Sequence, residues 1–207
     1  MYNPQAFREE RLDVLHALMK EHPLATLVTS GEHGLQASHL PFTVDTSTGK
    51  GILKAHLAKA NGQLADLRAG TEALVIFQGP EAYITPSWYA AKQEHGKVVP
   101  TWNYVVVHAY GTSRVIEDEG WLRQQIDELT LAHEQGRNVP WEVEDAPAEF
   151  IAALLPAIAG IEIPIERLEG KWKMSQNRSE ADRRGVRRGL EEENACPHLL
   201  SMFKDEK

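Results

Sequence analysis

Residues 79–104 read GPEAYITPSWY, then a charged link, then VPTWNY, and this stretch carries the strongest signal in the chain. It contains two of the five tryptophans and three of the five tyrosines. Hydrogen-bonding side chains alternate with the rings, namely Thr85, Ser87, Thr101 and Asn103. Aromatic side chains either pack a core or present flat surfaces to a planar ligand or a partner chain. Because buried polar groups need partners, the mixture favours a ligand surface, and an aromatic corner that closes a β-structure is the alternative.

The composition is that of a globular protein with an acidic surface. The chain has 207 residues, 42% hydrophobic and 25% charged, with a net charge of -8. An acidic chain is a poor general binder of nucleic acid or of anionic membranes. The N-terminal residues lack the apolar core of a signal peptide, and no stretch is apolar enough to span a membrane. Cys196 is the only cysteine, which fits a reducing compartment, so we expect a cytoplasmic protein.

The hydrophobic pattern predicts more strands than helices. Strands are expected at 24–30, 35–44, 52–57, 73–77, 102–116 and 161–168. Helices are expected at 4–21, 61–68, from 119 to about 133, at 148–159 and at 179–193. Short links between strands favour antiparallel pairing, and no regular βαβ alternation is present. We therefore expect a mainly β fold of the α+β class, a barrel or sandwich of about six strands. The whole chain, 1–207, would be one domain with a helical C-terminal extension from about residue 119.

Two short runs near the first strands could bind a ligand. The run SHLP begins at Ser38, and the run HLAKAN, residues 56–61, lies where a strand meets a helix. There Lys59, Asn61 and backbone N–H groups could hold a phosphate. The alternative is that Lys59 is a solvated surface lysine, and that His39 and His56 are structural histidines.

Basic residues gather toward the C-terminus. The run GKWKMSQNR, residues 170–178, could clamp a phosphate or a polar ring edge, or could be a basic surface loop. Residues 167–188 contain eight Lys or Arg and three Asp or Glu, a local net charge of +5. The helix at 179–193 mixes both signs of charge, so self-pairing along the helix is favoured over contact with DNA.

Several common catalytic motifs are missing from the sequence. It has no phosphate-binding loop, no dinucleotide-binding glycine motif, no zinc-protease motif and no nucleophile elbow. Cys196 lies beside Pro197 and His198, but nothing else in the sequence would orient a nucleophilic pair. No metal site is predicted.

Taken together and in order, the runs SHLP, HLAKAN, GPEAYITPSWY, VPTWNY and GKWKMSQNR resemble the PaiB family, described as FMN-binding negative transcriptional regulators related to flavin split-barrel proteins. The resemblance extends from about residue 1 to residue 193. Gly62 stands where proline is commoner, and Met174 stands where leucine is commoner.

The resemblance implies an antiparallel split barrel of six strands that forms a homodimer and binds FMN in a groove at the subunit interface. By motif position, Lys59 and Asn61 would contact the phosphate, and Ser38, His39 and His56 would line the groove floor. Trp88, Trp102 and Asn103 would approach the flavin ring, and the far end would be closed by Lys171, Lys173, Gln176 and Asn177. These residues suit the ligand, because a flavin needs flat apolar contact, hydrogen bonds at its polar edge and cations at its phosphate.

Four functions stay open from the sequence. The first is an FMN-binding regulator, for which only the helix at 179–193 offers a direct DNA contact. The second is an FMN-dependent oxidoreductase, in which the protein positions a substrate beside the flavin. The third is a haem-binding split barrel with His39, His56 or His108 as axial ligand. The fourth is a dimeric scaffold that has lost its cofactor.

Overall fold

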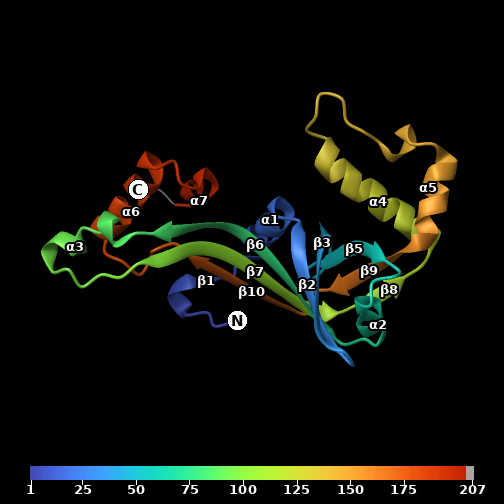
Figure 1. Cartoon of the computed structure of the whole chain (residues 1–207), viewed down its shortest axis with the longest axis horizontal. Coiled ribbons are helices and arrows are strands. Elements are labelled where there is room, and N and C mark those ends of the chain that lie inside the picture. The colour runs from blue at the N-terminus through green and yellow to red at the C-terminus, as the bar shows by residue number, and fades with distance from the viewer. Residues whose placement is uncertain (204–207) are drawn as a thin grey trace. The chain divides into compact units, whose positions relative to one another are not determined.

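The structure, a computed structural model, describes residues 1–203 of the chain (Figure 1). Its internal contacts divide it into two compact units. The first unit is built from Met1–Leu15, Gln78–Val107 and the chain from Glu169 onward, and the second from His16–Phe77 and His108–Leu168. The expectation of one domain with a helical extension from about residue 119 remains a prediction.

Strands make up most of the regular structure. In chain order they are β1 (Arg8–Glu9), β2 (Leu24–Gly31), β3 (Gly34–Pro41), β4 (Thr43–Asp45), β5 (Ile52–Ala58), β6 (Glu72–Ile84), β7 (Thr101–Thr112), β8 (Arg114–Ile116), β9 (Ile158–Pro164) and β10 (Arg167–Lys173). One sheet has the order β1-β10-β7-β6-β2-β3 and the other has the order β4-β5-β9-β8. The strand pairs described are antiparallel, as predicted.

Helices lie between and after the strands. The α-helices are α1 (Leu12–Glu21), α2 (Gln63–Arg68), α3 (Ala91–Glu94), α4 (Glu119–Glu134), α5 (Ala148–Leu154), α6 (Glu180–Glu192) and α7 (Pro197–Ser201). Short 3-10 helices are η1 (Gln5–Phe7), η2 (Pro86–Trp88), η3 (Val143–Asp145) and η4 (Leu155–Ala157). None of the helices within residues 1–203 has both the length and the apolar character needed to cross a bilayer.

The strand number is larger than predicted because three expected strands, at 35–44, 102–116 and 161–168, are each divided between the two sheets, the last of them into β9 and β10. The strand expected at 35–44 breaks after Pro41, which has no N–H for a ladder. Phe42 is buried there, packs edge-on against Phe77 at 6.0 Å, and separates β3 from β4. The strand expected at 102–116 breaks at Ser113, whose buried hydroxyl donates to the carbonyl of Leu67.

The ends of the chain also differ from the predicted pattern. The helix expected from residue 4 begins only at Leu12, because Arg8 and Glu9 pair with Lys171 and Gly170 of β10. The run at 170–178, for which a basic surface loop was one alternative, forms the second half of β10 as far as Lys173. Both differences share one cause: the pairing of β1 with β10 joins segments more than 160 residues apart.

In the second unit, α4 packs on β5 and β9 (Figure 1). Asp118 caps the helix by accepting a hydrogen bond from the backbone N–H of Trp121 at 2.8 Å. Leu122 and Gln125 are buried on the sheet side of the helix. The indole of Trp121 lies so close to Gly160 of β9 that a β-carbon there would be 2.1 Å from the ring. A glycine in β9 therefore makes room for the helix.

In the first unit, α6 begins where predicted and packs against η2. The side chain of Ser179 accepts a hydrogen bond from the N–H of Asp182 and so caps α6. A β-carbon at Gly185 would lie 1.9 Å from the carbonyl oxygen of Trp88, and one at Gly189 would lie 2.3 Å from the indole. Trp88 is thus held against α6 by two glycines one turn apart.

We expect Gly185→Ala to destabilise the protein, because the new methyl group would collide with the backbone at Trp88. Overpacking of this kind costs about 1–3 kcal/mol, and the better helix propensity of alanine returns up to about 1 kcal/mol. The free energy of unfolding, measured by urea denaturation, should fall by about 1–2 kcal/mol.

The matched control is Gly136→Ala, since a β-carbon at Gly136 meets no atom within 4 Å. Its effect should stay within about 0.5 kcal/mol. Equal stabilities for the two variants would contradict the packing of Trp88 on α6.

Candidate functional site

The predicted site residues are distributed over both units. Ser38, His39, His56, Lys59 and Asn61 lie in the second unit. Trp88, Trp102, Asn103, Lys171, Lys173, Gln176 and Asn177 lie in the first. The sequence does not predict this division. We therefore use the contacts within each unit to find which of these residues lie together.

A corner in the second unit joins two of the predicted residues. The side chain of Asn61 donates to the hydroxyl of Ser38 at 3.0 Å and accepts from the N–H of Gln63 at 2.9 Å. This fixes the chain between β5 and α2 against β3. The amide of Asn61 is therefore a structural link here, and α2 is only six residues long.

Lys59 at the same corner is partly exposed and belongs to a small charge cluster. Its Nζ lies 3.6 Å from Glu117, which also pairs with Arg68. The bond from Arg68, followed by the charge of Lys59, lowers the pKa of Glu117. Two cations share one carboxylate, so the cluster keeps a net positive charge at the surface.

The two predicted histidines of this unit do not join the corner. His39 follows Ser38 on β3, so the two side chains leave opposite faces of the strand. Nδ1 of His39 lies 3.0 Å from the hydroxyl of Thr26 on β2. Nδ1 of His56 lies 2.6 Å from Oε1 of Gln125, under α4. These contacts favour structural roles for both rings, and no cluster of three potential metal ligands occurs within residues 1–203.

In the first unit, three predicted residues line one cavity of about 200 Å³. They are Asn103, Lys173 and Asn177, and Thr101, Ser175, Arg178 and the Phe7 ring complete the lining. Thr101 could have been found from the sequence, because it lies two residues from Asn103 on the same strand face. Phe7 could not, because nothing local connects it with β7.

The polar groups of this cavity are only partly paired. Asn103 is fully buried, and its Oδ1 accepts a hydrogen bond from Ser175 at 3.1 Å. Its Nδ2 has no partner in the described part of the chain. Lys173 donates to the hydroxyl of Thr101 and to the carbonyl of Trp102. Burial, and then the charges of Lys171 and Arg178, lower the pKa of Lys173.

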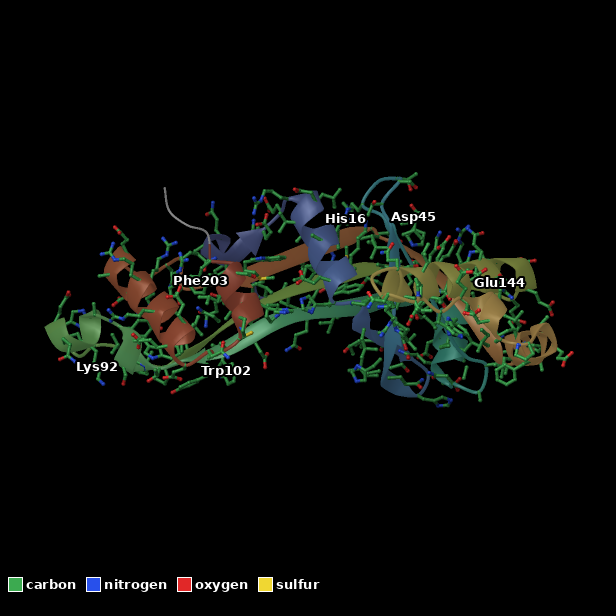
Figure 2. All side chains as sticks on the ribbon, turned by 90° about the horizontal axis from the view of Figure 1, so that it is seen from above. His16, Asp45, Lys92, Trp102, Glu144 and Phe203 are labelled. Atoms are coloured by element: carbon green, nitrogen blue, oxygen red, sulfur yellow. The ribbon has the colours of Figure 1, made fainter. Side chains whose placement is uncertain are left out.

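The remaining predicted residues of the first unit have separate surroundings. Trp102 is 51% exposed (Figure 2). It forms an edge-on pair with Tyr83, with 5.8 Å between the ring centroids. Lys171 is buried, donates to the carbonyl of Tyr2 and lies over Tyr104. Gln176 closes its own turn by bonding to the backbone of Trp172 and Met174. Trp88, at the end of η2, packs against α6. These four residues therefore do not meet at one point within the unit.

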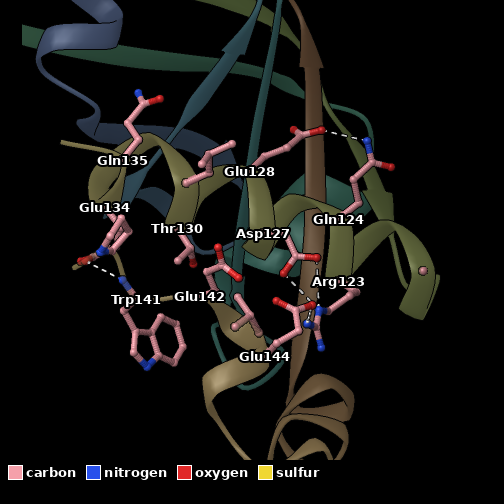
Figure 3. Close-up of a pocket in the computed structure, with 14 residues that line it drawn as sticks. Arg123, Gln124, Asp127, Glu128, Thr130, Glu134, Gln135, Trp141, Glu142 and Glu144 are labelled. Carbon is pink, nitrogen blue, oxygen red and sulfur yellow. Dashed lines mark hydrogen bonds and ion pairs between the residues drawn. The ribbon is translucent and has the colours of Figure 1, made fainter. Parts of the chain in front are cut away.

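A larger cavity of about 800 Å³ lies between α4 and the loop that follows it (Figure 3). Its lining contains one arginine and five acidic side chains, namely Arg123 and Asp127, Glu128, Glu134, Glu142 and Glu144. Arg123 is held by Asp127 and Glu144. The excess of carboxylates would repel a phosphate, so this cavity is chemically unsuited to FMN.

These two cavities differ in size and in charge. Pockets for ligands of drug size span roughly 300–1,000 Å³. The first unit's cavity is cationic and has a buried amide donor, which suits a phosphate, but it is too small for a whole flavin. The second unit's cavity is large enough but acidic. Neither cavity alone accommodates FMN.

The chain is similar to known proteins over most of its length. The family whose profile matches residues 1–167 is described as a "Putative FMN-binding domain". The protein AN0679 of Emericella nidulans is 37% identical over 227 residues, 92% of this chain and 90% of its own. Protease synthase and sporulation protein PAI 2 of Bacillus subtilis is 31% identical over 208 residues, 100% of this chain and 98% of its own.

Solved structures share the fold at low sequence identity. The FAD and haem binding protein of Mycobacterium smegmatis superimposes with a TM-score of 0.59 at 18% identity, covering 80% of this chain and 73% of its own. This likeness confirms the predicted antiparallel split barrel. With the family match and the Bacillus relative, it shows that this chain belongs to the PaiB family of FMN-binding split-barrel proteins, whose cofactor is FMN.

Proposed function

We propose that this chain is a flavoprotein that acts as a homodimer and holds FMN where two copies meet. When bound, FMN supplies the redox chemistry, and the chain's own residues bind and orient it. The cavities are consistent with this, because the one at Lys173 is too small for FMN and the one at Arg123 is acidic. A third cavity of about 490 Å³ beside Trp88 is lined by Arg184 and Arg188, and both arginines are already paired with glutamates of α6. A second copy would add the surface that one chain lacks.

The observation that carries this proposal is the exposed aromatic pair Tyr83–Trp102. Tyr83 is 49% exposed and Trp102 is 51% exposed, although both extend from central strands of a sheet. Large aromatic side chains left on the surface are typical of places covered by a ligand or a partner. A flavin ring or the second subunit would cover this pair.

The phosphate of FMN needs cations, and we assign it to the corner around Lys59. Lys59 is accessible there, and its bond to the exposed Glu117 is of the weak surface kind that a phosphate can replace. Ser38 and Asn61 fix the corner's backbone. Of the remaining predicted contacts, Trp88, His56 and Gln176 have structural partners, which favours indirect roles for them.

Trp102→Ala should weaken FMN binding, because an aromatic contact contributes about 0.5–1.5 kcal/mol beyond the area it buries. The dissociation constant, followed by quenching of flavin fluorescence, should rise by about two- to tenfold. Trp141→Ala is the matched control, because Trp141 is 45% exposed but lies in the acidic cavity. It should leave FMN affinity unchanged.

Two results would contradict the proposal. One is an equal change of FMN affinity in Trp102→Ala and Trp141→Ala, which would mean that the pair Tyr83–Trp102 does not contact FMN. The other is a monomer in sedimentation equilibrium at concentrations where FMN is bound. An absorption spectrum of the loaded protein also separates flavin from haem.

Direct regulation through DNA, which the family description implies, receives little support from α6. Three of its four arginines pair with a glutamate one turn away, namely Arg184 with Glu180, Arg187 with Glu191, and Arg188 with Glu192. The fourth, Arg183, also has an interaction partner. Paired charges of this kind lie on solvated helices, and they offer little net charge to a phosphate backbone.

We therefore expect the double variant Arg184→Gln, Arg188→Gln to leave any DNA affinity of the protein unchanged. Gel shifts with genomic DNA fragments at two salt concentrations would measure it, since each lost phosphate contact lowers the salt dependence by about one unit. Loss of binding in this variant would make α6 a DNA contact.

A further inference from the structure

The cavity between β7 and the turn after β10 contains positive charge without a counterion. Lys173 and Arg178 both line it, and its lining contains no carboxylate. Neither residue forms an ion pair with an acid in the part of the chain that the structure describes. Arg178 lies over the ring of Tyr89 at 4.9 Å. Two cations that face the same cavity repel each other unless an anion lies between them.

A buried amide in the same cavity has a hydrogen to donate. Ser175 adopts a left-handed backbone conformation, with φ of 61°, and its hydroxyl donates to Oδ1 of Asn103. In this arrangement Oδ1 faces Ser175 and Nδ2 faces away from it. Nδ2 is buried and has no acceptor among residues 1–203. Leaving such a donor unsatisfied is costly, so an acceptor beside it is expected.

A buried acidic side chain of the adjoining helix already has another hydrogen-bond partner. Asp182 of α6 is buried, and its carboxylate accepts a hydrogen bond from the N–H of Ala91 at 3.0 Å. It does not line the cavity. The lowered pKa of Lys173, caused by burial and by the charges of Lys171 and Arg178, agrees with an ammonium group that lacks its anion.

We propose that this cavity is an oxyanion site that binds a phosphate group through Lys173, Arg178 and the amide of Asn103. The three donors are of the kinds that bind phosphate oxygens: an ammonium, a guanidinium and a neutral N–H. The volume of about 200 Å³ suits one such group and excludes a whole flavin. Lys173 and Arg178 lie beyond residue 167, outside the segment that matches the FMN-binding family profile. With the FMN phosphate assigned to the corner at Lys59, this site would bind a separate phosphorylated small molecule. If it binds the phosphate of FMN instead, it replaces the assignment to Lys59.

The test is isothermal titration calorimetry of the full chain, freed of flavin, with inorganic phosphate at low ionic strength. We expect saturable binding at one site per chain. Lys173→Gln and Arg178→Gln should each weaken it by about tenfold or more, because each removes a charge-assisted hydrogen bond. Arg188→Gln is the control, since Arg188 is exposed and pairs with Glu192. It should leave the affinity unchanged.

Asn103→Asp gives the sharpest contrast, because it keeps the size of the side chain and the bond from Ser175. The new carboxylate would replace the unpaired donor by a negative charge facing Lys173 and Arg178. Phosphate binding should be lost while the midpoint of thermal unfolding without phosphate stays the same or rises. Retained phosphate binding in this variant, or no saturable binding by the unmodified chain, would overturn the proposal.

A second arm identifies the source of the phosphate group. If prior saturation with FMN blocks the phosphate titration and riboflavin does not, the site holds the phosphate of FMN. If both flavins leave the titration intact, the site serves a separate phosphorylated ligand. The inference is independent of the proposed homodimer: a dimer that binds FMN but shows no phosphate binding sensitive to Lys173→Gln or Arg178→Gln would overturn this inference and leave the proposed function standing.

Discussion

Alternation along β7 is the constraint on which the arrangement of the first unit depends. Successive side chains on a strand leave opposite faces, so Thr101 and Asn103 share one face and Trp102 occupies the other. The first face leads into a cationic cavity. The second presents an exposed aromatic ring beside Tyr83. One strand therefore separates a small polar site from a flat apolar surface, and the two cannot contact the same point of a ligand from the same chain.

The same constraint explains what the sequence could predict about the fold. Period-two patterns located β2 and β5 almost to the residue, because each has one face in a core and one face outside. Where the chain leaves one sheet for the other, at Phe42, at Ser113 and between β9 and β10, apolar residues continue on both sides of the break, and Pro41 alone marks the first one. Nothing in the local hydrophobicity distinguishes one long strand from two short ones. The pairing of β1 with β10 was beyond local reasoning altogether, since it depends on a partner far away in the sequence.

The sequence predicted which side chains have ligand-binding chemistry more reliably than it predicted which residues they contact. Asn103, Lys173 and Asn177 do line one cavity, and Ser38 does meet Asn61. Trp88 and His56 have the chemistry of ligand contacts, yet two helix glycines and a buried glutamine hold them instead. An aromatic or a histidine side chain can satisfy a core and a ligand equally well, so its neighbours in space decide between them. Those neighbours, Gly185, Gly189 and Gln125, lie on helices far along the chain.

The distribution of charge decides which surfaces can accept an anion. The basic excess of residues 167–188 suggests one positive patch, but α6 neutralises most of its arginines with glutamates of the same helix. Lys173 and Arg178, which precede that helix, face a cavity without carboxylates. In the second unit, the larger cavity gathers acids and so excludes anions, whereas the corner at Lys59 keeps a net positive charge. Net charge along the sequence is thus a poor guide to anion binding. Arginines that pair with glutamates of their own helix offer little charge to an anion, whereas cations that line a cavity without carboxylates keep theirs.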